Sequence, residues 1–252
     1  MTWLSHICSS ALLMLAMLAM LAWSAAPLAA SSVRGAVELV ESRSNSVLRY
    51  KDFAGVVVWL EPVSPAASRA SASSTPPVFE MKQKNKMFVP HLLAIPVGAA
   101  VAFPNLDPIF HNAFSNFNGQ LFDVGLYRPG SSRTVRFQRE GVVRVFCNIH
   151  PTMSAVIMVL KDPYFAVSTK TGTFEISGVP AGEYRLHVFH ERATAEALQS
   201  LERQIVVQNA TVVLPPIQIS EAGYLSAPHT NKFGKPYPRV IEDHRTYQES
   251  DQ

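Results

Sequence analysis

One cysteine, one histidine and one methionine stand close together in the segment VFCNIHPTM, residues 145–153. Cys147, His150 and Met153 follow one another at three-residue intervals, directly after an apolar run typical of a β-strand. A thiolate and a thioether are soft ligands, and an imidazole binds most late first-row transition metals. These three donors on one short loop therefore predict part of a transition-metal site.

A further donor is expected from a neighbouring strand, and the upstream segment NLDPIFHNAFS contains His111. This histidine precedes Cys147 by 36 residues, which is enough chain to fold back beside the loop. Thiolate suits Cu(I), imidazole serves both oxidation states of copper, and a weak axial methionine helps to set the potential. One thiolate, two imidazoles and one thioether together predict a single copper site of the blue, type 1 kind.

Each of these residues also has an ordinary structural interpretation. A cysteine in a β-strand is most often a small buried apolar side chain, and a lone histidine on an apolar strand is most often a core residue. The joint spacing favours copper, but a β-sandwich that has lost its metal, or holds it loosely, stays open. His91, in FVPHLLAIP, is a further candidate for a metal ligand or for a residue that supports one.

Composition limits the fold class and the partners. The chain has 252 residues, of which 48% are hydrophobic and 16% charged, so one or two domains with real cores are expected. Eighteen prolines and twelve glycines favour a β-rich fold with many turns. The net charge of +3 comes without a dense basic cluster, so we expect no nucleic-acid partner.

Residues 1–30 read as a signal peptide, because they lack Asp, Glu, Lys and Arg and run from a Leu/Met/Ala stretch into small residues. The alternative is a retained anchor, since Ile7 to Ala30 could span a bilayer. We expect a cleaved leader, a periplasmic or otherwise exported protein, and no stable membrane span. Cleavage removes Cys8, so Cys147 has no disulfide partner in the mature chain. A lone thiol in an oxidising compartment is buried, reactive or metal-bound.

Short strand signals separated by turns fill most of the remaining chain. Residues 33–62 contain two strand candidates, and the Ser/Ala/Pro-rich segment 64–77 reads as a linker. Residues 78–161 contain a dense series of short strand candidates, which is typical of a small β-sandwich or Greek-key barrel. Residues 221–252 form a polar tail that we expect to be extended or disordered.

The segments FVPHLLAIPVGAAVAFPNLDPIFHNAFS and GVVRVFCNIHPTM resemble the cupredoxin pattern of plastocyanin and azurin, and the short Cys-x-x-His-x-x-Met loop resembles that of amicyanin. The resemblance covers residues 78–161 and implies a cupredoxin Greek-key β-sandwich. It implies that the copper ligands are His111, Cys147, His150 and Met153. The wider chain resembles bacterial methylamine utilization proteins.

The same resemblance implies roles for residues around the ligands. Asn112 would tie the two ligand loops together, and Pro151 would stiffen the loop and remove a backbone N–H near the metal. An apolar shell that excludes water would consist of Phe110, Phe114, Phe146 and Ile149.

The segment GTFEISGVPAGEYRLHVF, residues 172–189, resembles the carboxypeptidase regulatory-like, or transthyretin-like, β-sandwich. The first two strands of such a lobe resemble GAVELV and AGVVVWLEP, within residues 33–62. We therefore hypothesise that the copper domain is inserted into a transthyretin-like lobe made of residues 33–62 and 162–220. Within the second piece, helical spacing of Ala and Leu predicts a short helix in 192–204.

These features predict an exported type 1 copper protein that carries single electrons between redox partners, which the sequence does not identify. The alternative is a copper-binding or structural module of the cell envelope without an electron-transfer role. A copper oxidase would need an open coordination position or further copper sites, and the sequence contains no His-x-His pair for a trinuclear cluster. We therefore expect no enzymatic activity.

Overall fold

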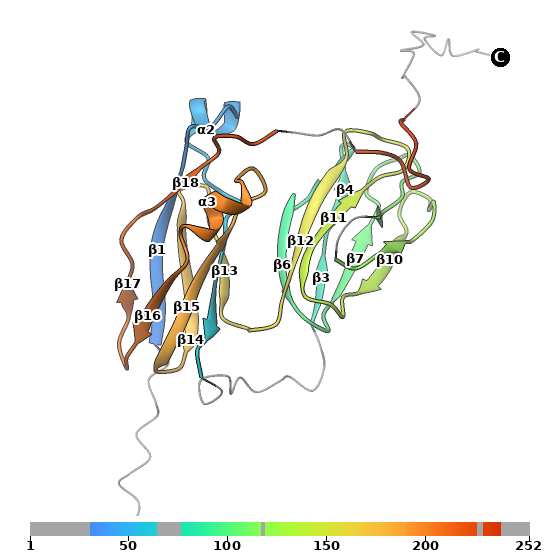
Figure 1. Ribbon diagram of the computed structural model, residues 1–252. Coiled ribbons are helices and arrows are strands. Elements are labelled where there is room, and N and C mark those ends of the chain that lie inside the picture. Colours follow the sequence, from blue (N-terminus) through green and yellow to red (C-terminus); the bar gives the residue numbers. More distant parts are fainter. Residues whose placement is uncertain (1–30, 65–76, 117–118, 226–228, 238–252) are drawn as a thin grey trace, which may run out of the picture.

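The computed structural model describes residues 31–64, 77–116, 119–225 and 229–237. The predicted leader, the interior of the predicted linker and the tail from residue 238 lie outside the described residues. The described chain consists of β-strands with two short helices, so the predicted all-β class is confirmed (Figure 1). No helix in these ranges is long and apolar enough to cross a membrane.

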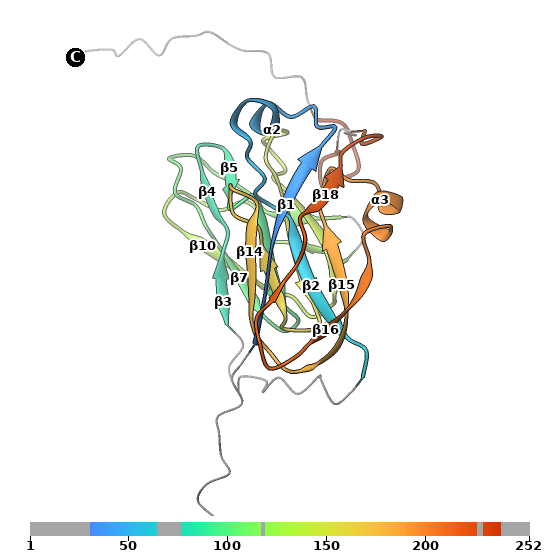
Figure 2. The same cartoon turned by 90° about the vertical axis from the view of Figure 1, so that its left-hand side faces the viewer.

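Two packed sheets form a first lobe, which we call the split lobe because its strands come from two separate stretches of chain. One sheet has the order β14-β1-β17, with β18 also paired with β1, and the other has the order β13-β2-β15-β16 (Figures 1 and 2). Its elements are β1 (Ser31–Val40), α2 (Asn45–Tyr50), β2 (Val57–Pro62), β13 (Phe165–Val167), β14 (Thr173–Val179), β15 (Gly182–Phe189), α3 (Ala195–Gln199), β16 (Arg203–Val207), β17 (Val212–Val213) and β18 (Ile217–Ser220). The strands that precede residue 63 therefore pair with strands that follow residue 161.

The intervening chain forms the second lobe, which we call the inserted lobe. Its sheets have the orders β10-β7-β3 and β6-β12-β11-β8-β9, and β4 and β5 form a separate hairpin. Its strands are β3 (Val78–Glu80), β4 (Lys82–Lys84), β5 (Met87–Val89), β6 (Leu92–Pro96), β7 (Ala100–Pro104), β8 (Phe114–Ser115), β9 (Phe122–Asp123), β10 (Ser132–Arg136), β11 (Gly141–Phe146) and β12 (Ser154–Leu160). Because β12 is antiparallel to β11 and parallel to β6, it lies inside its sheet with a neighbour on each side.

Strand β12 is buried on both faces, which explains its unbroken apolar sequence SAVIMVL. Ala155 and Val159 belong to the core of the inserted lobe, whereas Val156 and Leu160 join Val57 of β2 in an apolar cluster between the lobes. This division follows from the alternation of side chains along a strand. Complete burial of one such aliphatic side chain stabilises the fold by about 1.5–3 kcal/mol, so this cluster stabilises the contact between the two lobes.

The helix predicted within 192–204 is shorter than its sequence pattern indicates. Helix α3 covers only Ala195–Gln199, and its first turn is capped by the Thr194 side chain, which accepts a hydrogen bond from the Ala197 N–H. The last residues of the predicted helix instead begin β16, where Gln204 pairs with Arg185 of β15. Sheet pairing with a distant strand overrides the local helical spacing here.

Candidate metal centre

Two loops of the inserted lobe bring the predicted ligands together. His111 lies between β7 and β8, and its backbone exchanges hydrogen bonds of 3.2 and 2.9 Å with Tyr127. Cys147 directly follows β11, and His150 lies in the turn that leads to β12. The Cys147 N–H donates to the Met153 carbonyl at 3.2 Å, and the Met153 N–H donates to the His150 carbonyl at 3.1 Å. These bonds close the loop into a compact turn.

Three donor atoms face one another at the centre of the site. The His111 Nδ1 lies 3.9 Å from the Cys147 Sγ, which lies 3.6 Å from the His150 Nδ1, and the two Nδ1 atoms are 3.1 Å apart. The point in their plane that is equally far from all three atoms lies about 2.1 Å from each. For comparison, a zinc-sized ion forms bonds of about 2.0–2.1 Å to imidazole nitrogen and about 2.3 Å to thiolate sulfur. Among the described His, Cys, Asp and Glu residues, these three form the group that could hold a metal.

The tautomer of His111 is determined by a buried carboxylate. Its imidazole is 0% exposed, and its Nε2 lies 2.8 Å from the Asp107 Oδ2. A carboxylate accepts hydrogen bonds, so the Nε2 carries the proton and the Nδ1 presents its lone pair. That lone pair points toward Cys147 and His150, as a metal ligand requires.

Asp107 is a supporting residue that the sequence reasoning missed. Its carboxylate also accepts the N–H groups of Asn85 at 2.6 Å and Lys86 at 2.8 Å, in the tight turn between β4 and β5. Burial alone would raise the pKa of Asp107, but the hydrogen bonds from Lys86, His111 and Asn85 lower it. An acidic residue four positions before a candidate histidine was the available signal.

His150 lies closer to the surface than the other two ligand candidates, since it is partly buried whereas His111 and Cys147 are 0% exposed. Burial lowers the pKa of His150, and repulsion from His111 and Lys86 lowers it further. The neutral imidazole, which is the form that binds metals, therefore persists to lower pH than in water.

Met153 occupies the end of the same loop. Its side chain is 1% exposed and belongs to the same core cluster as Cys147. The backbone bond from Cys147 keeps the two residues adjacent across the turn. Its role as the axial ligand stays a prediction.

Asn112 joins the two ligand loops. Its Oδ1 accepts the Asn148 N–H at 3.3 Å, and its Nδ2 donates to the Asp123 Oδ1 at 2.8 Å. Phe114, in β8, is buried and its ring packs 5.9 Å from that of Phe146. These contacts hold the loop of His111 against the loop of Cys147.

The expected apolar shell is only partly present. Phe114 and Phe146 are buried, but Phe110 is 56% exposed and Ile149 is 42% exposed. Neighbouring side chains on extended backbone point to opposite sides, so burial of His111 turns Phe110 outward. Ile149 precedes the ligand candidate His150 in the turn and likewise faces solvent.

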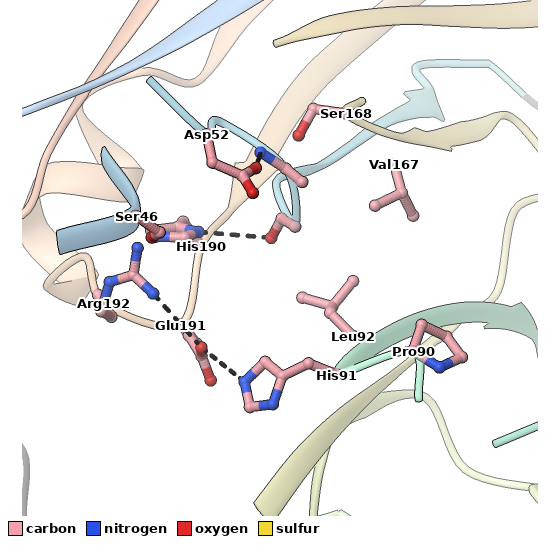
Figure 3. A pocket seen from close by; sticks show the side chains of 12 residues that line it. Ser46, Asp52, Pro90, His91, Leu92, Val167, Ser168, His190, Glu191 and Arg192 are labelled. Carbon is pink, nitrogen blue, oxygen red and sulfur yellow. Dashed lines mark hydrogen bonds and ion pairs between the residues drawn. The ribbon is translucent and has the colours of Figure 1, made fainter. Parts of the chain in front are cut away.

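His91 lies outside the metal group and takes part in a contact between the lobes. Its Nδ1 is 3.0 Å from the Ser154 carbonyl of the same lobe. Its Nε2 is 2.7 Å from the Glu191 Oε1 of the other lobe, and both residues line a pocket between the lobes (Figure 3). The hydrogen bond to Glu191 raises the pKa of His91 despite the opposing effect of burial. A carboxylate from the other lobe thus holds the His91 ring, and the expectation that His91 binds or supports a metal stays a prediction.

Residues 229–237 of the predicted polar tail belong to the described residues. Residues 229–237 lack helix and strand, but they lie against the loop of Cys147 and His150 (Figure 1). The His229 Nε2 lies 2.7 Å from the Pro151 carbonyl, so Pro151 anchors the tail, and its expected role in stiffening the loop stays a prediction. This part of the predicted polar tail is therefore held against the ligand loop by these contacts.

A scan against protein-family models and a search of curated proteins returned no match. Among solved structures, part of the chain is similar to a Cu-containing nitrite reductase (NirK) from Thermus scotoductus SA-01. The identity is 25% over 40% of this chain and 27% of that chain, with a TM-score of 0.32. The chain therefore spans only 27% of the length of the reductase.

A purple cupredoxin from Nitrosopumilus maritimus is 29% identical over 33% of this chain and 98% of its own, with a TM-score of 0.30. A reduced Cu(I) form of an amicyanin variant is 17% identical over 41% of this chain and 98% of its own, with a TM-score of 0.32. Solved structures similar to part of this chain therefore include cupredoxins, each matched over less than half of the chain.

Proposed function

We propose that the chain is a type 1 copper protein that carries single electrons between redox partners, without catalysing a reaction of its own. The proposed ligands are His111, Cys147, His150 and Met153. The observation that supports this most is the convergence of one sulfur and two imidazole nitrogens to distances that fit one metal ion. A soft thiolate among two imidazoles favours copper over harder cations.

Copper, when bound, supplies a one-electron couple, and the protein supplies a site of fixed shape. Asp107 holds the His111 ring in one tautomer, and Asn112 holds the two ligand loops together. Buried Phe114 and Phe146 limit access of water on one side. Ligands that are held in place in this way change position little between oxidation states, which favours rapid electron transfer.

Partly exposed His150 is the proposed route for electrons, since the other donor atoms are buried. We propose an extracytoplasmic location, because of the predicted leader and because a buried, metal-bound thiolate would be protected in an oxidising compartment. We further propose that the split lobe is a transthyretin-like β-sandwich that serves in packing or docking, because it has no catalytic signature that we recognise.

The second candidate is a copper-binding or structural module of the cell envelope. It is favoured by the cluster between the lobes, where Leu160 and Val57 are buried, because this packing makes the metal site part of a larger structural body. Both candidates use the same ligands, so they differ in redox behaviour and not in copper content.

Optical and electron paramagnetic resonance spectra of the copper-loaded chain test the proposal. An intense thiolate-to-copper charge-transfer band that disappears in Cys147→Ser would support the carrier. Bound copper without that band would favour the binding module. Turnover of an amine or a phenol would instead indicate an enzyme.

A further inference from the structure

The tail segment 229–237 makes its contacts with the ligand loop through both side chains and backbone. The Tyr237 hydroxyl donates to the carbonyl of Cys147 at 2.8 Å. A tyrosine hydroxyl is protonated at neutral pH, so it can donate this bond. A residue from the tail thus holds the backbone of the proposed thiolate ligand.

His229 contacts the opposite end of the same loop. Its Nε2 bonds the Pro151 carbonyl at 2.7 Å, and its ring stacks on Phe146 with centroids 4.0 Å apart and an interplanar angle of 22°. The Tyr237 ring packs edge-on against His229 at 5.1 Å. These two tail residues therefore hold the turn on both sides of His150.

Lys232 adds contacts to the residues that join the two ligand loops. Its N–H donates to the Asn148 Oδ1 at 3.0 Å, and its ammonium pairs with the Asp123 Oδ2 at 2.7 Å. Asp123 in turn accepts from Asn112, the residue that bonds the Asn148 N–H. The tail segment is therefore bonded directly to the loop of Cys147 and, through Asp123, indirectly to Asn112 beside His111.

We propose that residues 229–237 form a strap that positions the ligand loop before copper binds and slows the loss of bound copper. Inside the loop, the backbone bonds from Cys147 to Met153 and from Met153 to His150 provide the local restraint. The strap adds three bonds, at the Cys147 carbonyl, the Asn148 side chain and the Pro151 carbonyl. The part of this inference that concerns copper loss rests on the function proposed above.

Two substitutions remove the strap contacts with little change of shape. Tyr237→Phe keeps the ring and removes the hydroxyl, and His229→Phe keeps an aromatic ring on Phe146 but removes the bond to Pro151. Tyr50→Phe is the matched control, because Tyr50 lies in α2 of the split lobe and is 77% exposed. All variants are made in the full chain.

Hydrogen exchange of the metal-free protein is the first measurement. Loss of one hydrogen bond should speed the exchange of amides in residues 147–153 about fivefold in Tyr237→Phe, and more in the double variant. Amides in the middle of β11 and β12 should keep their rates. Unchanged loop exchange in the double variant would overturn the strap, and so would equal acceleration throughout the inserted lobe, which would indicate general destabilisation.

The second measurement is the rate at which bound copper is lost to a chelator, monitored by the visible or ultraviolet absorption of the bound metal. We expect release about fivefold faster in Tyr237→Phe, with a shifted absorption spectrum, and no change in Tyr50→Phe. Faster loop exchange with unchanged release would overturn the copper-retention part. A chain that binds no copper would refute the proposed function, while the exchange experiment would still decide whether the strap exists.

Discussion

Asp107→Asn removes one charge and leaves the shape of the side chain nearly unchanged. In the better of its two orientations, the amide oxygen accepts from Lys86 and His111, and the amide NH₂ then faces the Asn85 N–H. One buried donor loses its partner, which costs about 1–3 kcal/mol, and the two remaining bonds lose their charge assistance, which costs about another 1 kcal/mol. Because Asp107 is 7% exposed, water cannot readily replace these bonds.

We therefore expect Asp107→Asn to destabilise the metal-free protein by about 2–4 kcal/mol, measured by urea unfolding at neutral pH. Copper affinity, measured by competition with a chelator, should fall about 10–100-fold, because the His111 Nε2–H keeps an acceptor but loses the negative charge that raises the basicity of the ring as a ligand. Asp162→Asn is the control: burial raises the pKa of that carboxyl, so its neutralisation should cost no stability. Equal stability and equal copper affinity of Asp107→Asn and the wild type would refute this account of the site.

Three further predictions address other parts of the molecule. Leu160→Ala, in the cluster between the lobes, should lower the free energy of unfolding by about 2–4 kcal/mol. The control Val206→Ala changes a residue that is 58% exposed and should alter that free energy by less than about 0.5 kcal/mol. Similar effects of both substitutions would argue against the cluster. The pKa of His91, followed by NMR titration, should lie above 6.5 and fall in Glu191→Gln. Because the folded-state pKa is raised, the stabilisation from this pair should be fully present below pH 6.5 and lost as the pH rises through the raised value; a His91 that titrates identically in both proteins would contradict the contact. Met153→Leu should retain copper and raise the reduction potential, since a weak donor is lost from the oxidised state; an unchanged potential and spectrum would remove Met153 from the ligand set.

Local patterns in the sequence were sufficient for the ligand loop and for most strands. The spacing of Cys147 and His150 places both side chains within one turn, so their proximity needs no distant contact. Apolar runs such as SAVIMVL and VVVWL mark strands β12 and β2, which are buried on both faces. The proximity of Cys147 to His150 and the burial of these strands depend on residues a few positions apart, so the sequence alone determined them.

Contacts between distant residues were decided only by the tertiary structure. His91 meets Glu191 across 100 positions of sequence, and Tyr237 meets Cys147 across 90. Asp107 is four positions from His111 in sequence, but its other partners lie in the β4–β5 turn, and the spacing alone does not indicate them. Side-chain periodicity reports which face of an element is buried, but not which element covers it, because burial is non-directional. The partner of each buried polar group therefore emerged only when the lobes and the tail were packed together.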